Sequence, residues 1–302
     1  MKKIVLFSFV YLFTLSGYSC DICGCGLGNY YIGMVPQFNG SFFGVRYHYR
    51  AFHTQIAADK TQFSNDYFNT VELWGGLNIG KRWQVLAFVP YSFNKQISDD
   101  GVTKSNGLGD IATLVNYSLL EKTTVNKHNK LVFQQLWIGA GIKAPTGTSA
   151  IDPSAADIVA LANSQLGSGS TDFLFNAAYT MRINKIGFTT NSSYKINTRN
   201  KESYHFGNRF SSNNFFHYSI KKGNATIIPN IGFLYEHSMA NKLNNAAVAQ
   251  TGGFAGMGAA GVEVSFKKIS VGFNAQAPVF QDYAEGQTQT RFRSMVHVTF
   301  AL

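Results

Sequence analysis

Three cysteines near the start of the chain carry its most reactive side chains. Cys20, Cys23 and Cys25 lie within six residues of one another, and the sequence has no other cysteine. Their thiolates could bind a soft ion such as Cu(I), or a thiophilic one such as Zn(II). A disulfide in an oxidising compartment, lipid attachment at Cys20 and chance clustering are the alternatives that the sequence leaves open.

Basic side chains recur at alternate positions in two segments, one near each end of the chain. They are Arg46, His48 and Arg50 in the first segment, and Arg291, Arg293 and His297 in the last. In an extended strand such side chains share one face. If the two segments pair, they concentrate positive charge on one wall of a lumen, and arginine-rich walls select anions.

Acidic residues with the same inward parity give a second interpretation of these cations. They are Glu72, Asp110, Glu236 and Glu263, and the basic Lys143 completes the predicted lumen-lining set. Salt bridges among these groups would fill the lumen and stop flow, whereas unpaired cations would guide an anion. The sequence alone does not decide between them.

Four aromatic residues also share the inward parity. Trp74, Phe88, Trp137 and Phe215 could bind an apolar ligand inside a barrel. A register slip of one residue would instead turn them outward into a lipid-facing aromatic belt, which is the commoner location of tryptophan in such proteins. No nucleophile-elbow sequence, paired-carboxylate spacing or metalloprotease spacing accompanies these residues, so we expect no enzymatic activity.

The elements that must position these residues are about twelve segments of alternating apolar and polar residues. Each is near the roughly 9 to 11 residues that a tilted strand needs to cross a membrane. The first three centre on 43–49, 71–79 and 83–93; the others run near 108–119, 131–143, 172–182, 186–197, 208–220, 225–236, 254–266, 269–279 and 291–302. The sequence therefore predicts an all-β protein, an antiparallel transmembrane β-barrel of about twelve strands.

Short and long connections alternate between these segments. The longer loops are predicted near 54–66, 94–105, 144–170, 198–207, 237–252 and 280–290, and the longest of the short turns at 121–129. Lysines and arginines cluster at the short turns, and acids in the long loops. Short turns face the periplasm in bacterial barrels, so a cationic inner rim could contact anionic lipid of the outer membrane. The alternative is that turns are simply where lysine is tolerated, which explains the location of these residues but not the difference in sign.

The first residues predict export. Lys2 and Lys3 precede an apolar run over 4–15, and Gly17, Tyr18 and Ser19 form a small-any-small cleavage pattern. We therefore divide the chain into a signal peptide (1–19), a cysteine-containing lead-in (20–37) and an outer-membrane barrel (38–302). The formal charge of +10 falls to +8 without the two signal lysines, and an exported chain with dispersed basic residues is not expected to bind nucleic acid.

Several turn and strand motifs resemble a family of bacterial outer-membrane proteins labelled as MetA-pathway phenol-degradation proteins, related to long-chain fatty-acid transporter barrels. The motifs run, in order, Phe88-Val89-Pro90-Tyr91, Gly107-Leu108-Gly109-Asp110, Gly141 to Gly147, Gly167 to Asp172, and Ala277-Pro278-Val279-Phe280-Gln281 followed by Gly286-Gln287. The resemblance implies a barrel that acts as a transporter or channel, and it carries over no catalytic residue. It says nothing of the cysteines.

Together these observations predict a passive outer-membrane channel or transporter for a small molecule, not coupled to energy. The resemblance favours an apolar or aromatic solute, and the lumen charges favour an anion. The alternative is a metal-handling barrel whose cysteines receive copper or zinc from a periplasmic metal-delivery partner.

Overall fold

Inward and outward side chains alternate along each long strand. The computed structural model describes residues 40–55, 62–99, 101–153 and 162–302. In β1 (Phe42–Gln55), Phe42 and Arg46 are buried, whereas Phe43 and Val45 are 52% and 42% exposed. The exposed face is the apolar one and the buried face carries the charge, which is the reverse of a water-soluble sheet.

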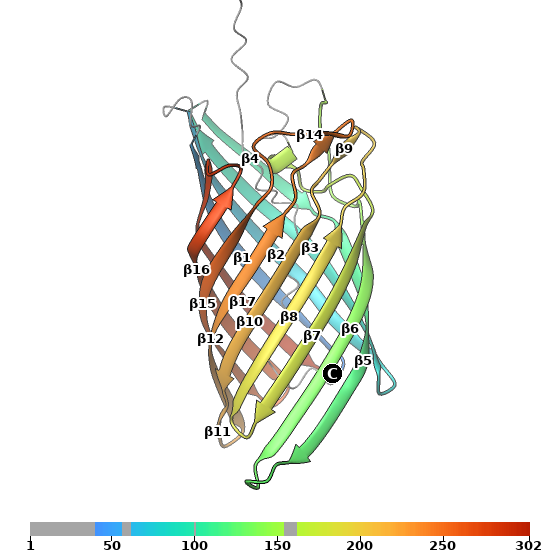
Figure 1. Cartoon of the computed structure of the whole chain (residues 1–302), viewed down its shortest axis with the longest axis vertical. Helices are drawn as coiled ribbons and strands as arrows, with labels where there is room; N and C mark the ends of the chain where they lie inside the picture. Colours follow the sequence, from blue (N-terminus) through green and yellow to red (C-terminus); the bar gives the residue numbers. More distant parts are fainter. Residues whose placement is uncertain (1–39, 56–61, 100, 154–161) are drawn as a thin grey trace, which may run out of the picture.

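Twelve strands of the described chain form one closed antiparallel barrel, which confirms the predicted fold class (Figure 1). After β1 these are β2 (Phe63–Ile79), β3 (Trp83–Ser98), β5 (Ile111–Val125), β6 (Leu131–Ala144), β7 (Asp172–Ile183), β8 (Ile186–Ile196), β10 (Arg209–Tyr218), β12 (Ala225–Ser238), β15 (Gly253–Phe266), β16 (Ile269–Tyr283) and β17 (Thr288–Ala301). β11 (Ile220–Lys222) continues the line of β10.

Closure depends on the pairing of the first strand with the last. β1 pairs with β17 from Phe42 opposite Ala301 to Thr54 opposite Thr288, and β10 pairs with β12. A closed barrel leaves no unpaired backbone edge, which is the requirement for a sheet in lipid. No helix in the described part of the chain is long and apolar enough to cross a membrane.

Three prolines lie in the strands, and each is at an irregularity in strand pairing. Pro90 lies where β3 changes partner from β5 to β4 (Gly101–Leu108). Pro229 lies in β12 beside the break between β10 and β11, and Pro278 lies at a register shift between β15 and β16. Proline cannot donate a backbone hydrogen bond, so these are the positions where a strand tolerates it.

Several predicted loops are strands in the structure. The expected loop near 94–105 is wrong, because β3 and β4 continue as a hairpin from Tyr91 opposite Leu108 to Ser98 opposite Gly101. The expected loop near 280–290 is largely strand as well, and β5 extends to Val125. The loop near 237–252 contains β13 (Lys242–Leu243) and β14 (Ala246–Ala247), which form a small sheet with β9 (Tyr204–His205).

The two ends of the barrel differ. The β9–β13–β14 sheet and the long loops lie at one end, and the short turns and the C-terminus lie at the other (Figure 1). The basic residues of the short turns are exposed, among them Lys127, Lys185 and Lys267. At the start of β3, next to one of these turns, Trp83 contacts Tyr117, with ring centroids 4.8 Å apart. Arg82 donates a 2.9 Å hydrogen bond to the Tyr117 hydroxyl. Such aromatic and cationic pairs mark a membrane interface.

Candidate functional site

The inward face of β1 lies at the centre of the candidate site. Arg46 is opposite Glu72 on β2 and opposite His297 on β17, so strand register alone places the three side chains on one wall. The Nε of Arg46 donates a 2.7 Å hydrogen bond to Glu72 Oε1, and its Nη2 bonds to the same oxygen. Both side chains are buried, so the predicted cation is paired rather than free to attract a solute.

Aromatic rings complete the surroundings of Arg46. Its guanidinium carbon lies 4.2 Å from the ring centroid of Trp74 and 5.3 Å from that of Phe88. His48 is near the same carboxylate, with its Nε2 4.0 Å from Glu72. A guanidinium over an aromatic face gains about 0.5 to 2 kcal/mol. The cluster therefore combines charge neutralisation with stacking.

A glycine between two strands lets His297 approach Glu263. His297 Nε2 lies 3.5 Å from Glu263 Oε1, although β16 separates their strands. Gly272 of β16 is opposite both residues. A Cβ at Gly272 would lie 2.1 Å from His297 Nε2, so the imidazole occupies the space that a larger residue would fill.

A third pair lies further along the same wall. Arg293 Nη2 is 2.5 Å from Glu236 Oε1, and the Tyr283 hydroxyl donates to the same oxygen. Arg293 also lies 5.4 Å from the Phe52 ring centroid, and Arg50 lies 6.0 Å from that of Phe68. Sequence reasoning missed Tyr283 because the residue lay in the expected loop near 280–290. In the structure β16 extends to Tyr283, and the register shift near Pro278 changes its inward parity.

One predicted lumen residue is placed differently. Arg291 is the additional residue of a β-bulge between β1 and β17, where Ala51 is opposite Phe292 and Phe52 is opposite Thr290. Its side chain is exposed, whereas Thr290 and Arg293 on either side are buried. The prediction that Arg291 lines the lumen is therefore wrong. It assumed strict alternation over 291–297, and a bulge shifts the inward and outward positions of a strand by one residue.

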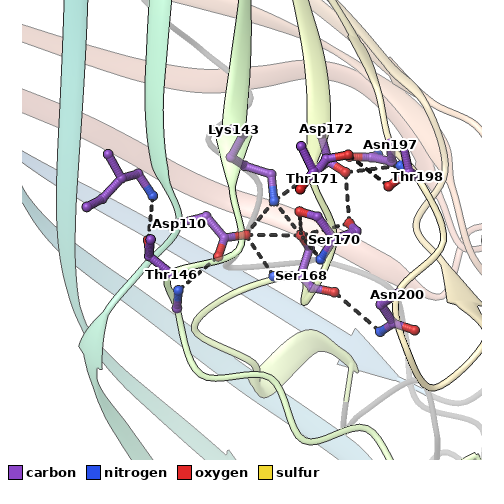
Figure 2. A network of polar contacts seen from close by, with 12 residues as sticks. Asp110, Lys143, Thr146, Ser168, Ser170, Thr171, Asp172, Asn197, Thr198 and Asn200 are labelled. Carbon is purple, nitrogen blue, oxygen red and sulfur yellow. Dashed lines mark hydrogen bonds and ion pairs between the residues drawn. The ribbon is translucent and has the colours of Figure 1, made fainter.

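Lys143 forms the most deeply buried ionic network, shown in Figure 2. Its ammonium contacts Asp110, and it lies 2.8 Å from Asp172 Oδ2; the three side chains are at most 1% exposed. Strand register explains one contact, since Lys143 on β6 is directly opposite Asp172 on β7. Sequence reasoning missed Asp172 as a partner, although it follows the Gly167 to Thr171 motif at the start of a strand.

Asp110 also fixes both described ends of the β6–β7 loop. Its Oδ1 accepts a 3.0 Å hydrogen bond from the Gly147 amide, and its Oδ2 accepts a 2.8 Å bond from the Ser168 amide. Asp172 accepts hydrogen bonds from the Ser170 hydroxyl and the Thr198 amide. Three of the turn motifs noted in the sequence thus converge on one buried network that attaches the loop to the barrel wall.

Inward apolar residues form two larger clusters, besides the smaller pair of Phe52 and Phe68. The first lies on the arc from β1 to β7, and the second on the arc from β10 to β16. Their members are Phe42, Trp74, Leu86, Phe88, Ala112, Leu114 and Leu174 in the first, and Phe215, Leu234, Ala255, Met257 and Tyr283 in the second. Trp137 is partly buried. The belt interpretation of Trp74, Phe88 and Phe215 is therefore wrong, because all three are at most 3% exposed.

The cysteines fall outside the described residues, so metal binding, disulfide formation and lipid attachment at Cys20, Cys23 and Cys25 stay predictions, as do the signal peptide and the lead-in. In the described ranges, no group of three or more His, Cys, Asp or Glu residues is placed to hold a metal ion.

No protein-family model and no curated protein sequence matches the chain. Solved structures do. An outer membrane channel from Pseudomonas putida F1 is similar over 87% of this chain and 96% of its own, with a TM-score of 0.60 and 14% identity. The fold is that of an outer-membrane β-barrel. The β domain of the Bordetella autotransporter BrkA is similar over 87% of this chain and 100% of its own, with a TM-score of 0.52 and 10% identity.

The outer-membrane β-barrel fold agrees with the apolar outer surface of the barrel and with a location in the outer membrane. With such low identity, the comparisons establish architecture only. The MetA-pathway label and the relation to fatty-acid transporter barrels therefore stay interpretations of the sequence motifs.

Proposed function

We propose that the protein is a passive channel of the outer membrane for a small solute with a flat apolar part and a polar group. The observation that carries this proposal is the composition of the barrel interior. Two apolar clusters face inward beside charges that already have partners: Arg46 with Glu72, and Arg293 with Glu236. The paired charges agree with the interpretation in which salt bridges fill much of the lumen, and the apolar side chains are packed against one another. A path between these side chains would present apolar groups and neutralised charges rather than free cations.

The anion interpretation is the weaker one, for an electrostatic reason. A buried guanidinium that is paired with a carboxylate has little remaining field to attract a second negative charge. Arg46 and Arg293 each have a carboxylate partner, and Lys143 contacts two aspartates. Selectivity would then follow the shape and apolar surface of the solute more than the sign of its charge.

Solute uptake into proteoliposomes tests the proposal with four permanently charged probes. Benzenesulfonate and methanesulfonate are anions with and without a ring, and benzyltrimethylammonium and tetramethylammonium are the corresponding cations. We expect the aromatic member of each pair to enter faster, whatever its charge, and liposomes without protein to serve as the control. Faster entry of both anions, with no advantage from the ring, would instead support an anion channel.

A variant connects the uptake to the inward apolar clusters. Phe215 is 1% exposed and belongs to the second cluster, whereas Phe216, beside it, is 59% exposed on the outer surface. Phe215→Ala should reduce the advantage of the aromatic probes, and Phe216→Ala should leave it unchanged. Equal behaviour of the two variants would count against a lumenal path past this cluster.

The metal-handling alternative has no supporting observation among the described residues, and it stays a prediction about Cys20, Cys23 and Cys25. Elemental analysis of the purified protein tests it. Copper or zinc near one equivalent, lost when the three cysteines are replaced by serine, would favour it. Metal content that the replacement leaves unchanged would remove it. The prediction that the protein is not an enzyme likewise awaits an assay of lipase and esterase activity.

A further inference from the structure

A hollow on the outer surface of the barrel lies at the end that carries the short turns. Its volume is about 500 Å³, and it lies between β7, β8 and β10. Its walls include Ile183, Ile186 and Phe216, which are exposed on the outer face, and Phe188, which is partly exposed. The rings of Phe188 and Phe216 pack with centroids 4.9 Å apart. This groove would therefore contact the acyl chains of the membrane.

Cationic and polar groups surround only the rim of the groove. Lys130, Asn184 and Lys185 come from the two turns that border it, and Tyr218 adds a phenol on the β10 side. Both lysines are exposed, and neither has an ion-pair partner among the described residues. The hollow thus has an apolar interior and two ammonium groups on the side nearest the water.

Local strand geometry forms this hollow. The β7–β8 turn has only two residues, with Ile183 opposite Ile186 and Asn184 at a positive φ of 52°. The neighbouring β5–β6 hairpin extends beyond it (Figure 1). On the other side the chain bends at Ser219, whose amide donates a 2.7 Å hydrogen bond to the Lys185 carbonyl. A short hairpin between two longer neighbours leaves a recess beside the interface.

We propose that this groove, which we name the β7–β10 groove, binds one anionic glycerophospholipid from the periplasmic leaflet. An acyl chain would lie on Phe188 and Phe216, and the phosphate would lie between Lys130 and Lys185. Charge complementarity supports this occupant, because lysines near a membrane surface attract anionic headgroups and basic pockets between membrane elements hold them. The leaflet follows from the short-turn end, which faces the periplasm. The proposal does not depend on the solute in the lumen.

Native mass spectrometry of the full protein, released from nanodiscs of mixed phosphatidylglycerol and phosphatidylcholine, tests the assignment. We expect one retained phosphatidylglycerol per barrel. Lys130→Gln with Lys185→Gln should weaken this retention by roughly fivefold per lysine, because each surface lysine adds a modest attraction to anionic lipid. The matched control is Lys267→Gln with Lys268→Gln, a lysine pair at the β15–β16 turn and outside the groove.

A second variant keeps the charges and fills the recess. Met181 lines the groove on β7, and Met181→Trp should also reduce retention. Both variants should keep the heat-dependent electrophoretic shift of a folded barrel. Retention that is unaffected in either groove variant overturns the site. An equal loss in the Lys267 and Lys268 control also overturns it, because it shows attraction to the whole cationic rim.

Discussion

At the scale of single residues, the main ionic contacts of the lumen are those of Arg46, Lys143 and Arg293 with buried carboxylates. The sequence predicted most of these groups from alternation alone, because parity along a strand is set by geometry. It could not predict which acid pairs with which base, since contacts such as Arg293 with Glu236 cross two intervening strands. Arg291 was misplaced for a related reason, because a bulge has no reliable signature in one sequence.

Lys143 gives the clearest prediction at this scale. Lys143→Met removes the cation from between Asp110 and Asp172 and leaves two buried carboxylates without it. Breaking a buried ion pair on one side typically costs about 3 to 5 kcal/mol, so we expect a loss of about that size in the free energy of unfolding. Urea titration of the barrel in detergent, followed by tryptophan fluorescence, measures it.

Two further variants separate the loss of stability caused at the buried Lys143 network from any general effect of replacing a lysine by methionine. Lys127→Met changes an exposed lysine in the β5–β6 turn and should shift stability by less than about 0.5 kcal/mol. Replacing Asp110 and Asp172 by asparagine in the Lys143→Met background should restore part of the loss, because neutral groups no longer oppose each other. If Lys127→Met lowers the free energy of unfolding as much as Lys143→Met does, the stabilising role assigned to the Lys143 network is contradicted.

At the scale of elements, strand positions were predicted better than strand ends. Apolar alternation located the twelve strands, because the lipid imposes one apolar face on each. It gave no information on β4 or on the β9–β13–β14 sheet, whose strands need no membrane-facing side. Hairpins that continue beyond the membrane are held by backbone hydrogen bonds and polar side chains, which resemble a loop in sequence.

The glycines of the barrel wall supply the prediction at this scale. Gly272→Ala places a methyl group where His297 lies, and a Cβ there would be 2.1 Å from the imidazole. Because the ring must move away from Glu263, we expect a loss of about 1 to 3 kcal/mol, typical of an overpacked site. The matched control is Gly258→Ala on β15, where the nearest side-chain atom is at an ordinary 3.5 Å. Equal unfolding midpoints for the two variants would refute this role of Gly272.

At the scale of the whole molecule, the protein is a closed barrel whose outer surface is apolar and whose interior is polar with two apolar clusters. The outer surface and the closure were evident from the sequence. The balance of charge inside was not, since it depends on side chains brought together from strands far apart in the chain. That balance is what supports the proposed passage of a solute chosen by its apolar surface.

The measurement that tests this account most directly is the reversal potential of the reconstituted channel under a potassium chloride gradient. If the inward cations are paired, the unmodified protein should discriminate weakly between the two ions. Glu72→Gln with Glu236→Gln removes the partners of Arg46 and Arg293 and should shift the reversal potential toward chloride. Strong chloride selectivity in the unmodified protein, unchanged in the double variant, would contradict the account.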